Sequence, residues 1–225
     1  MSDTDLIDKR QQRHRTSNRI LAAAREIVMR DGYSELTMRR LAAAVGYSPA
    51  ALYLHFAGRD EIALILRDEA LAALALALDE HALEVADVHP IQAVGRAWLN
   101  FARTQPQLYA LALIERMPLA IGLIGAVDAG AAGAADDSMA VVPGEAPPAG
   151  AAVQRSLLRA LRPEDPSTPM YGLDARAETV MAVLHGLASL QLLQPGMLTV
   201  PVDALLQLAL RSLLRGWPGM PERPA

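Results

Sequence analysis

Residues 37–56 read TMRRLAAAVGYSPAALYLHF, and this stretch decides the fold of the N-terminal part of the chain. Thr37 is a suitable N-cap for a helix, which Gly46 ends after about two turns because glycine readily adopts the left-handed conformation. Ser48 and Pro49 begin a second helix at once, since serine is a favoured N-cap and proline suits the first helical position. Two short helices joined by a glycine-centred turn predict a helix-turn-helix unit.

The flanking sequence predicts a longer helix on each side of this unit. Apolar residues over 16–31 fall on one helical stripe, which Gly32 ends. A second long helix is expected over residues 59–81, with acidic residues in its first turn. We therefore predict a three-helix domain over residues 16–58. Residues 1–15 have no apolar periodicity, and we expect them to form a flexible basic arm without a signal-peptide core.

Charge is distributed unevenly along the chain. The net charge is −4, which alone would argue against a nucleic-acid partner. Residues 9–59, however, contain ten Lys/Arg and three Asp/Glu, whereas residues 60–225 contain 11 basic and 19 acidic residues. A basic block on an acidic body indicates a polyanionic partner for the N-terminal part. Cysteine is absent, which excludes disulfides and thiolate chemistry and fits a cytoplasmic protein.

Residues 19–62 resemble the DNA-binding domain of the TetR (tetracycline-repressor) family. The similarity joins an alanine-rich first helix, a spaced glycine and threonine, an LYxHF recognition helix and a cation that opens the fourth helix. The residues that carry it are Ala22, Ala23, Gly32, Thr37, Leu41, Ala42, Gly46, residues 52–56 and Arg59. The resemblance implies a transcriptional regulator that binds a palindromic operator as a homodimer, with half-sites about one helical turn apart.

The recognition helix divides its side chains between the core and DNA. Leu52 and Phe56 are four residues apart and should face the core, which leaves Tyr53 and His55 to meet the nucleic acid. Tyr53 could instead belong to the core, and His55 could simply cap the helix. The family often has a polar residue where this chain has alanines at 50 and 51, so readout here would rely on thymine methyl contacts and on Arg39.

The resemblance assigns Arg39 to a base edge, because arginine bonds guanine in a bidentate manner. Tyr47 and Ser48 are expected to touch phosphate or cap helices. Arg39 and its neighbour Arg40 could also form an ordinary solvated face. The predicted DNA-contact residues are Thr37, Arg39, Arg40, Tyr47, Ser48, Ala50, Ala51, Tyr53, His55 and Arg59.

The remainder of the chain predicts an all-α fold, with a helical-bundle effector and dimerisation domain over residues 59–225. Alanine and leucine dominate this part and favour helices. Residues 129–150 are rich in Ala, Gly and Pro and are expected to form a flexible loop. Further helices are expected over residues 91–103, 106–117, 119–127, 151–161, 174–193 and 202–217.

The second domain resembles one subgroup of TetR C-terminal domains, through an aromatic helix, a P-x-L-Y segment and a His-Gly pair at residues 185–186. A small apolar effector between helices is expected, because residues 91–128 carry few charges. The candidate lining could equally be plain core. The histidines show no metal-ligand spacing and no carboxylate partners, so no metal site is expected, and no cofactor is expected either. The candidate ligand-binding residues are Trp98, Phe101, Tyr109, Met117, His185 and Gln191.

Two apolar helices near the C-terminus predict a dimer interface. Stripes over residues 174–193 and 202–217 would form a four-helix interface between two protomers, as the resemblance implies. The candidate interface residues are Met181, Leu184, Ala188, Leu206, Leu210 and Leu213.

Two other functions compete with a ligand-released repressor. A helical enzyme is disfavoured because the sequence has no cysteine, no phosphate-binding glycine loop and no G-x-S-x-G motif. An architectural DNA-binding protein without an effector is disfavoured by the long acidic second domain.

Overall fold

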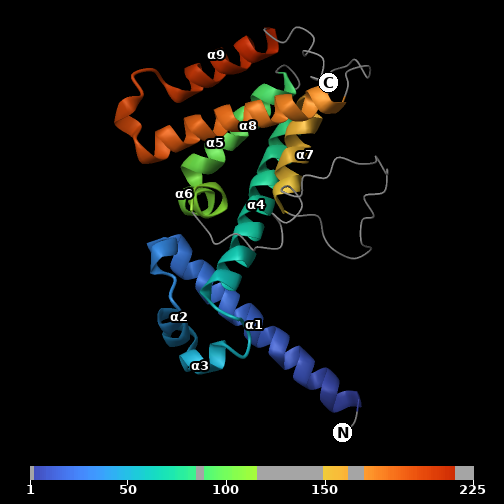
Figure 1. The fold of residues 1–225 in the computed structure, drawn as a ribbon, viewed down its shortest axis with the longest axis vertical. Helices are drawn as coiled ribbons and strands as arrows, with labels where there is room; N and C mark the ends of the chain where they lie inside the picture. The colour runs from blue at the N-terminus through green and yellow to red at the C-terminus, as the bar shows by residue number, and fades with distance from the viewer. Residues whose placement is uncertain (1–2, 85–88, 116–148, 162–169, 216–225) are drawn as a thin grey trace, which may run out of the picture.

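The computed structural model describes residues 3–84, 89–115, 149–161 and 170–215, which are helices and the turns between them (Figure 1). The described residues contain no strand, so the predicted all-α fold is confirmed. The helices are α1 (Asp3–Asp31), α2 (Met38–Val45), α3 (Pro49–Leu52), α4 (Arg59–Glu84), α5 (Pro90–Thr104), α6 (Pro106–Tyr109), α7 (Ala149–Leu161), α8 (Met170–Leu193) and α9 (Val202–Arg215). Short 3₁₀ turns span Tyr33–Glu35 and Pro195–Met197, and a π-helical turn over Ala110–Ile114 follows α6.

The helix caps lie where the sequence predicts them. The Thr37 hydroxyl accepts a hydrogen bond from the Arg40 backbone N–H at 3.2 Å, and Gly46 ends α2 with a φ of 72°. The Ser48 hydroxyl accepts from the Ala51 N–H at 3.2 Å and opens α3. These caps satisfy backbone N–H groups that have no partner inside the helix.

Two hydrophobic cores lie at opposite ends of the molecule, and α4 runs from one into the other (Figure 1). The N-terminal core packs α1, α2 and α3 against the start of α4, around residues such as Ile20, Leu41 and Leu52. The C-terminal core lies among α4, α5, α7, α8 and α9. Movement of α4 would therefore act on both cores.

Helix α5 and helix α9 pack closely at Gly95. A Cβ atom at this position would lie 3.0 Å from a Leu206 methyl and 3.1 Å from a Leu210 methyl. Gly95 is buried, and its lack of a side chain allows α9 to approach. No helix among the described residues is long and apolar enough to cross a membrane.

Four expectations change or lie wholly or partly outside the described residues. The predicted flexible arm is wrong for residues 3–15, which continue α1 as helix; the buried half of α1 provides the nucleus, and each added residue then costs little. The helix predicted over 106–117 becomes α6 and the π-helical turn that ends at Ile114. The expected helix over 119–127 and residues 129–148 of the expected loop lie outside the described residues, whereas the last two residues of that loop, 149 and 150, begin α7.

Candidate functional site

The face expected to read DNA is formed by α3 and the turn that follows it. Leu52 and Phe56 are buried in the N-terminal core, whereas Tyr53 is 56% exposed, as the spacing predicts. Helix α3 ends at Leu52, earlier than the sequence suggests, so Tyr53 lies in the turn beyond it. Leu54, which the sequence interpretation omitted, is 71% exposed beside Tyr53. Ala50 is exposed, and its small side chain leaves this face narrow.

Helix α1 holds in place the recognition segment, which consists of α3 and the turn that follows it up to Phe56. Arg13 donates to the Leu54 carbonyl at 2.9 Å, and the Ser17 hydroxyl lies 3.2 Å from Nδ1 of His55. Arg19 donates to the Val45 carbonyl. These residues were missed from sequence, because nothing in the pattern of α1 indicates which turn its polar side chains meet.

Arg19 also orders Tyr47. The Arg19 guanidinium lies 4.8 Å from the centre of the Tyr47 ring, which is within the range of a cation–π contact. The predicted DNA contacts Tyr47 and His55 are thus tied to α1, while Tyr47 stays 37% exposed. Such ordering keeps the entropy cost of binding DNA low.

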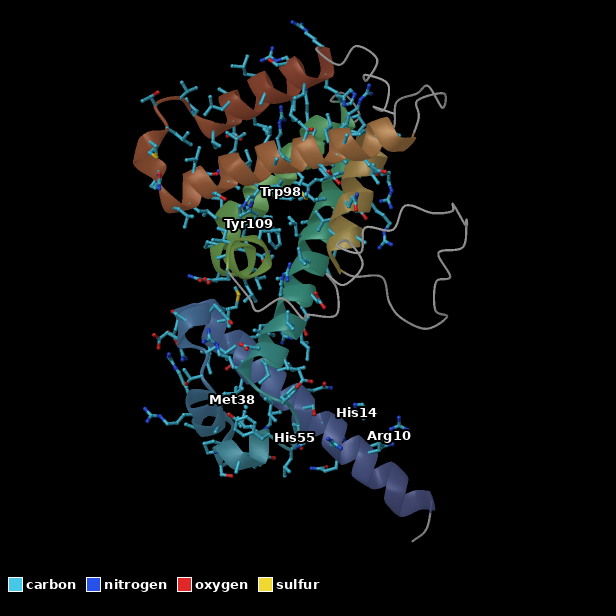
Figure 2. The ribbon with its side chains drawn as sticks, viewed as in Figure 1. Arg10, His14, Met38, His55, Trp98 and Tyr109 are labelled. Atoms are coloured by element: carbon cyan, nitrogen blue, oxygen red, sulfur yellow. The ribbon has the colours of Figure 1, made fainter. Side chains whose placement is uncertain are left out.

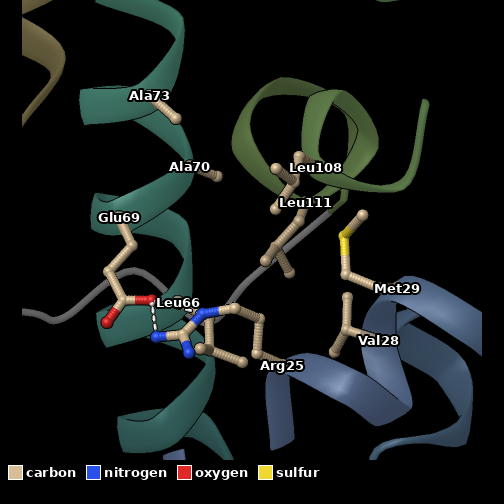
Figure 3. A pocket seen from close by; sticks show the side chains of 9 residues that line it. All are labelled: Arg25, Val28, Met29, Leu66, Glu69, Ala70, Ala73, Leu108 and Leu111. Atoms are coloured by element: carbon tan, nitrogen blue, oxygen red, sulfur yellow. Dashed lines mark hydrogen bonds and ion pairs between the residues drawn. The ribbon is translucent and has the colours of Figure 1, made fainter. Parts of the chain in front are cut away.

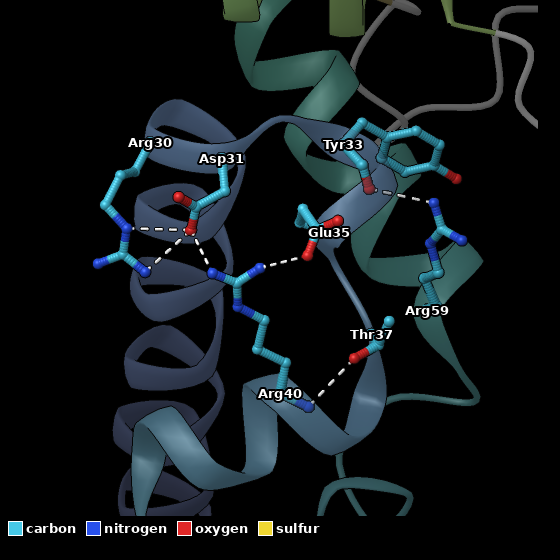
Figure 4. A network of polar contacts seen from close by, with 7 residues as sticks. All are labelled: Arg30, Asp31, Tyr33, Glu35, Thr37, Arg40 and Arg59. Atoms are coloured by element: carbon cyan, nitrogen blue, oxygen red, sulfur yellow. Dashed lines mark hydrogen bonds and ion pairs between the residues drawn. The ribbon is translucent and has the colours of Figure 1, made fainter.

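The two neighbouring arginines of α2, Arg39 and Arg40, differ in their contacts within the described part of the protein. Arg39 is exposed and forms no hydrogen bond or ion pair with any residue the structure describes. Arg40 pairs with the carboxylates of Asp31 and Glu35, the latter at 2.6 Å (Figure 4). A hydrogen bond from Arg30 holds the pKa of Asp31 below its usual value, so this carboxylate is ionised at neutral pH. Arg39 is therefore the arginine of α2 that can turn to DNA.

Arg59, a predicted DNA contact, interacts within the protein. Its guanidinium donates to the Tyr33 carbonyl at 3.1 Å and lies 4.2 Å from the centre of the Tyr33 ring (Figure 4). These contacts join the first residue of α4 to the turn between α1 and α2. Arg59 therefore couples α4 to the DNA-binding domain.

Three of the candidate effector residues form a chain of hydrogen bonds in the C-terminal core. Trp98 donates from Nε1 to the Tyr109 hydroxyl at 3.0 Å, and that hydroxyl lies 2.9 Å from Nδ1 of His185. Trp98 and Tyr109 are completely buried (Figure 2). The chain crosses α5, α6 and α8.

Burial determines where the protons lie in the chain of hydrogen bonds from Trp98 to His185. It raises the pKa of Tyr109 to about 12 and lowers the pKa of His185, so the phenol is protonated and the imidazole neutral at pH 7. Indole can only donate, so the Tyr109 hydroxyl accepts from Trp98 and donates to Nδ1 of His185. The Nε2–H of His185 then points toward the Ser189 hydroxyl, 3.5 Å away.

The structure separates the remaining effector candidates. Phe101 is buried in the same core as Trp98. Gln191 instead lines a polar pocket of about 430 Å³ together with Arg96 and Arg103. Met117 lies outside the described residues.

Most of the candidate interface residues are buried within the single chain. Leu184, Ala188, Leu206 and Leu210 belong to the C-terminal core of the protomer, with at most 1% exposure. Met181 and Leu213 are only partly buried. A helix with apolar residues on several sides does not reveal from sequence which side meets its own core.

A different set of apolar side chains faces outward at the same end of the molecule. Leu193 ends α8, Met197 and Val200 lie in the turn, and Leu208 is on α9. Leu193, Met197 and Leu208 are more than 60% exposed and Val200 is 45% exposed. Sequence periodicity could have found Leu208, which lies off the stripe that contains Leu206 and Leu210.

Comparison with solved structures supports the fold. A protein of unknown function from Rhodococcus sp. RHA1 has 25% identity and a TM-score of 0.59, covering 89% of this chain and 94% of its own. A TetR-family transcriptional regulator from Pectobacterium atrosepticum has 20% identity and a TM-score of 0.59, covering 95% and 99%. BioQ, crystallised with its natural double-stranded DNA operator, has 22% identity and a TM-score of 0.55, covering 88% and 98%.

Comparison with family models identifies both parts of the chain. The model of the bacterial regulatory proteins of the tetR family matches residues 20–65, which hold the helix-turn-helix. The model of the tetracyclin repressor-like C-terminal domain matches residues 91–213. No curated protein gives a significant match. The chain belongs to the TetR family of bacterial DNA-binding transcriptional regulators.

Proposed function

We propose that this regulator is a repressor that binds a palindromic operator as a homodimer and is released by a small, largely apolar ligand. The observation that carries the DNA-binding part is the side-chain division at residues 50–56. Leu52 and Phe56 are buried, while Ala50, Tyr53 and Leu54 are exposed on a segment that α1 holds in place. BioQ, which shares the fold, was crystallised with an operator duplex, and this supports DNA as the partner.

Arg39 and His55 have different tasks in this proposal. Arg39 is exposed, has no hydrogen-bond or ion-pair partner in the described part of the chain, and reads a base edge in the major groove. His55, held by Ser17, contacts the phosphate backbone and fixes the position of the domain. Thr37 and Ser48 mainly serve as helix caps, because their hydroxyls accept backbone hydrogen bonds.

The dimer forms through the exposed apolar residues of the α8–α9 region. Leu193, Met197, Val200 and Leu208 lose contact with water when a second copy covers them. Leu206 and Leu210 support this face from beneath, since they are buried against α5. Two-fold pairing places two recognition segments on successive half-sites.

The ligand site in the C-terminal domain is the chain of hydrogen bonds that joins Trp98, Tyr109 and His185. A ligand that separates Tyr109 from His185 must replace their hydrogen bond, because an unpaired buried polar group costs about 1–3 kcal/mol. The effector is therefore apolar with one group that hydrogen bonds. Its entry shifts α6 and α8 relative to α4, which continues into the DNA-binding core.

A gel shift with the DNA upstream of the chain's own gene tests the proposal. We expect a retarded complex that persists against excess random DNA and that disappears when Arg39 and Tyr53 are both changed to alanine. A reporter driven by this promoter should be silenced by the regulator. Increased reporter output would show an activator instead, and equal retardation of random DNA would favour an architectural protein.

A further inference from the structure

A cavity lies where the DNA-binding domain meets the C-terminal domain (Figure 3). It has a volume of about 220 Å³, and three elements form its walls: α1, α4 and the segment from α6 into the π-helical turn. Val28 and Met29 come from α1, Leu66 and Ala73 from α4, and Leu108 and Leu111 from the third element. None of these six residues is a candidate effector residue of the bundle core.

The chemistry of the walls specifies the class of ligand. Only Arg25 and Glu69 carry charge among the lining residues, and they form an ion pair of 2.6 Å with each other (Figure 3). The pair neutralises both charges at the edge of the cavity, so a charged ligand would gain little there. The other lining residues are apolar, which favours a neutral, hydrocarbon-like molecule.

The size of the cavity limits the ligand. A buried cavity of about 150 Å³ in another protein accepts benzene, so by proportion about 220 Å³ accepts roughly nine non-hydrogen atoms. The cavity persists because α4 presents the small side chains of Ala70 and Ala73 to it. Met29 lines the cavity and is 39% exposed, so it lies between the cavity and solvent, and its unbranched side chain can adapt to a ligand.

The walls belong to both hydrophobic cores. Val28, Leu66 and Leu111 pack in the N-terminal core, whereas Ala70 is buried in the C-terminal core and Leu108 packs against it. A molecule that fills the cavity therefore contacts both domains at once. If α1 moves relative to α6, these contacts change, so the molecule binds the two arrangements with different affinity. A ligand can shift a conformational equilibrium only through such a difference in affinity.

We propose that this junction cavity binds a small, neutral, hydrocarbon-like molecule and that its occupation weakens operator binding. The direction of the effect rests on the proposed function, in which ligands release DNA. Filling the cavity fixes the position of α1 against α4 and α6, and so restricts the adjustment of the recognition segment that α1 holds. By linkage, operator DNA weakens the binding of the small molecule by the same factor.

Toluene is a suitable probe, and the methionine methyl groups provide the readout. In methyl-¹³C-methionine spectra of the full chain, we expect toluene to shift the Met29 signal in a saturable manner. Met38, which lies on α2 away from the cavity, serves as the internal reference (Figure 2). The indole N–H signal of Trp98, recorded on ¹⁵N-labelled chain, distinguishes this site from the bundle core. A fixed Met29 signal up to the solubility of toluene, or a shift of Trp98 alone, would overturn the proposal.

A matched pair of variants then tests the coupling to DNA. Ala73→Leu fills the cavity, whereas Ala72→Leu adds the same atoms to an exposed position of α4. We expect saturating toluene to weaken operator binding at least about fivefold in wild type and Ala72→Leu but not in Ala73→Leu. Toluene that binds at Met29 without changing operator affinity contradicts the coupling.

The two proposals can fail separately. If the chain does not bind its upstream DNA, the repressor proposal fails, while the Met29 titration still decides whether the cavity binds toluene. If Ala73→Leu does not fold, the titration of the wild-type chain remains decisive for the site. The dependence of toluene affinity on operator DNA then tests the coupling without any variant.

Discussion

At the scale of single residues, Arg39 and His55 separate recognition of sequence from general attachment to DNA. Arg39→Ala should cost about 1–3 kcal/mol on the operator and relax the preference at one base pair. His55→Ala should weaken operator and random DNA by similar factors, because its proposed contact is to phosphate. Fluorescence anisotropy with both DNAs measures this, and equal losses for the two variants on each DNA would contradict the division.

His185 makes the stability of the C-terminal core depend on pH. Burial lowers its pKa from 6.5, so the folded state favours the neutral imidazole that accepts from Tyr109. The unfolded chain binds a proton near pH 6.5 and the folded chain only at lower pH, so the contribution is complete above pH 6.5 and is lost as pH falls through the folded pKa.

Urea unfolding between pH 8 and 5 measures this contribution against the His185→Gln variant, which retains an acceptor for Tyr109. We expect the wild type to lose stability relative to the variant below pH 6.5. A wild-type chain that becomes more stable than the variant as pH falls would show that His185 is not held in its neutral form.

At the scale of elements, the sequence predicts helices well where caps and periodicity act together. The ends of α2 and the start of α3 are fixed by Thr37, Gly46 and Ser48. The two hydroxyls accept hydrogen bonds from backbone N–H groups, and Gly46 adopts the left-handed conformation that ends α2. The extension of α1 over residues 3–15 was missed, since a solvated helix that continues from a buried one carries no apolar stripe. The internal partners of Arg40 and Arg59, both predicted DNA contacts, could not be found from sequence, because they depend on the path of the chain.

Sequence alone could not resolve which faces of α8 and α9 meet a second protomer, and substitutions in the proposed interface test this. Leu208 is 61% exposed, so Leu208→Glu should leave the protomer folded while it places an unpaired carboxylate in the proposed dimer face, a cost of several kcal/mol. Leu210 is 1% exposed, so Leu210→Glu should instead unfold the C-terminal core.

Sedimentation and circular dichroism distinguish these outcomes. Leu76→Glu is the matched control, since Leu76 is 60% exposed on α4, and it should remain a folded dimer. A dimer that survives Leu208→Glu would place the interface on another face of the molecule.

At the scale of the whole molecule, an acidic protein must bind a polyanion. The net charge is −4, yet ten of the 21 Lys/Arg lie within residues 9–59, where Arg13 donates to Leu54 of the recognition segment and Arg19 to Val45 at the end of α2. Residues 60–225 contain 19 acidic and 11 basic residues, and we expect this acidic balance to limit non-specific adhesion to DNA. Specific binding then depends on the local field and not on the total charge.

This arrangement predicts steep dependence of operator binding on salt in spite of the acidic total. If each half-site neutralises about four phosphates, the logarithm of the association constant should fall with the logarithm of salt concentration with a slope of about −7 per dimer. Anisotropy titrations between about 50 and 300 mM KCl give the slope. Arg15→Ala, which removes an exposed cation from the N-terminal half of α1, should reduce it by about 1 if that half contacts phosphate. A slope shallower than about −2 would mean that the basic block does not face the DNA backbone.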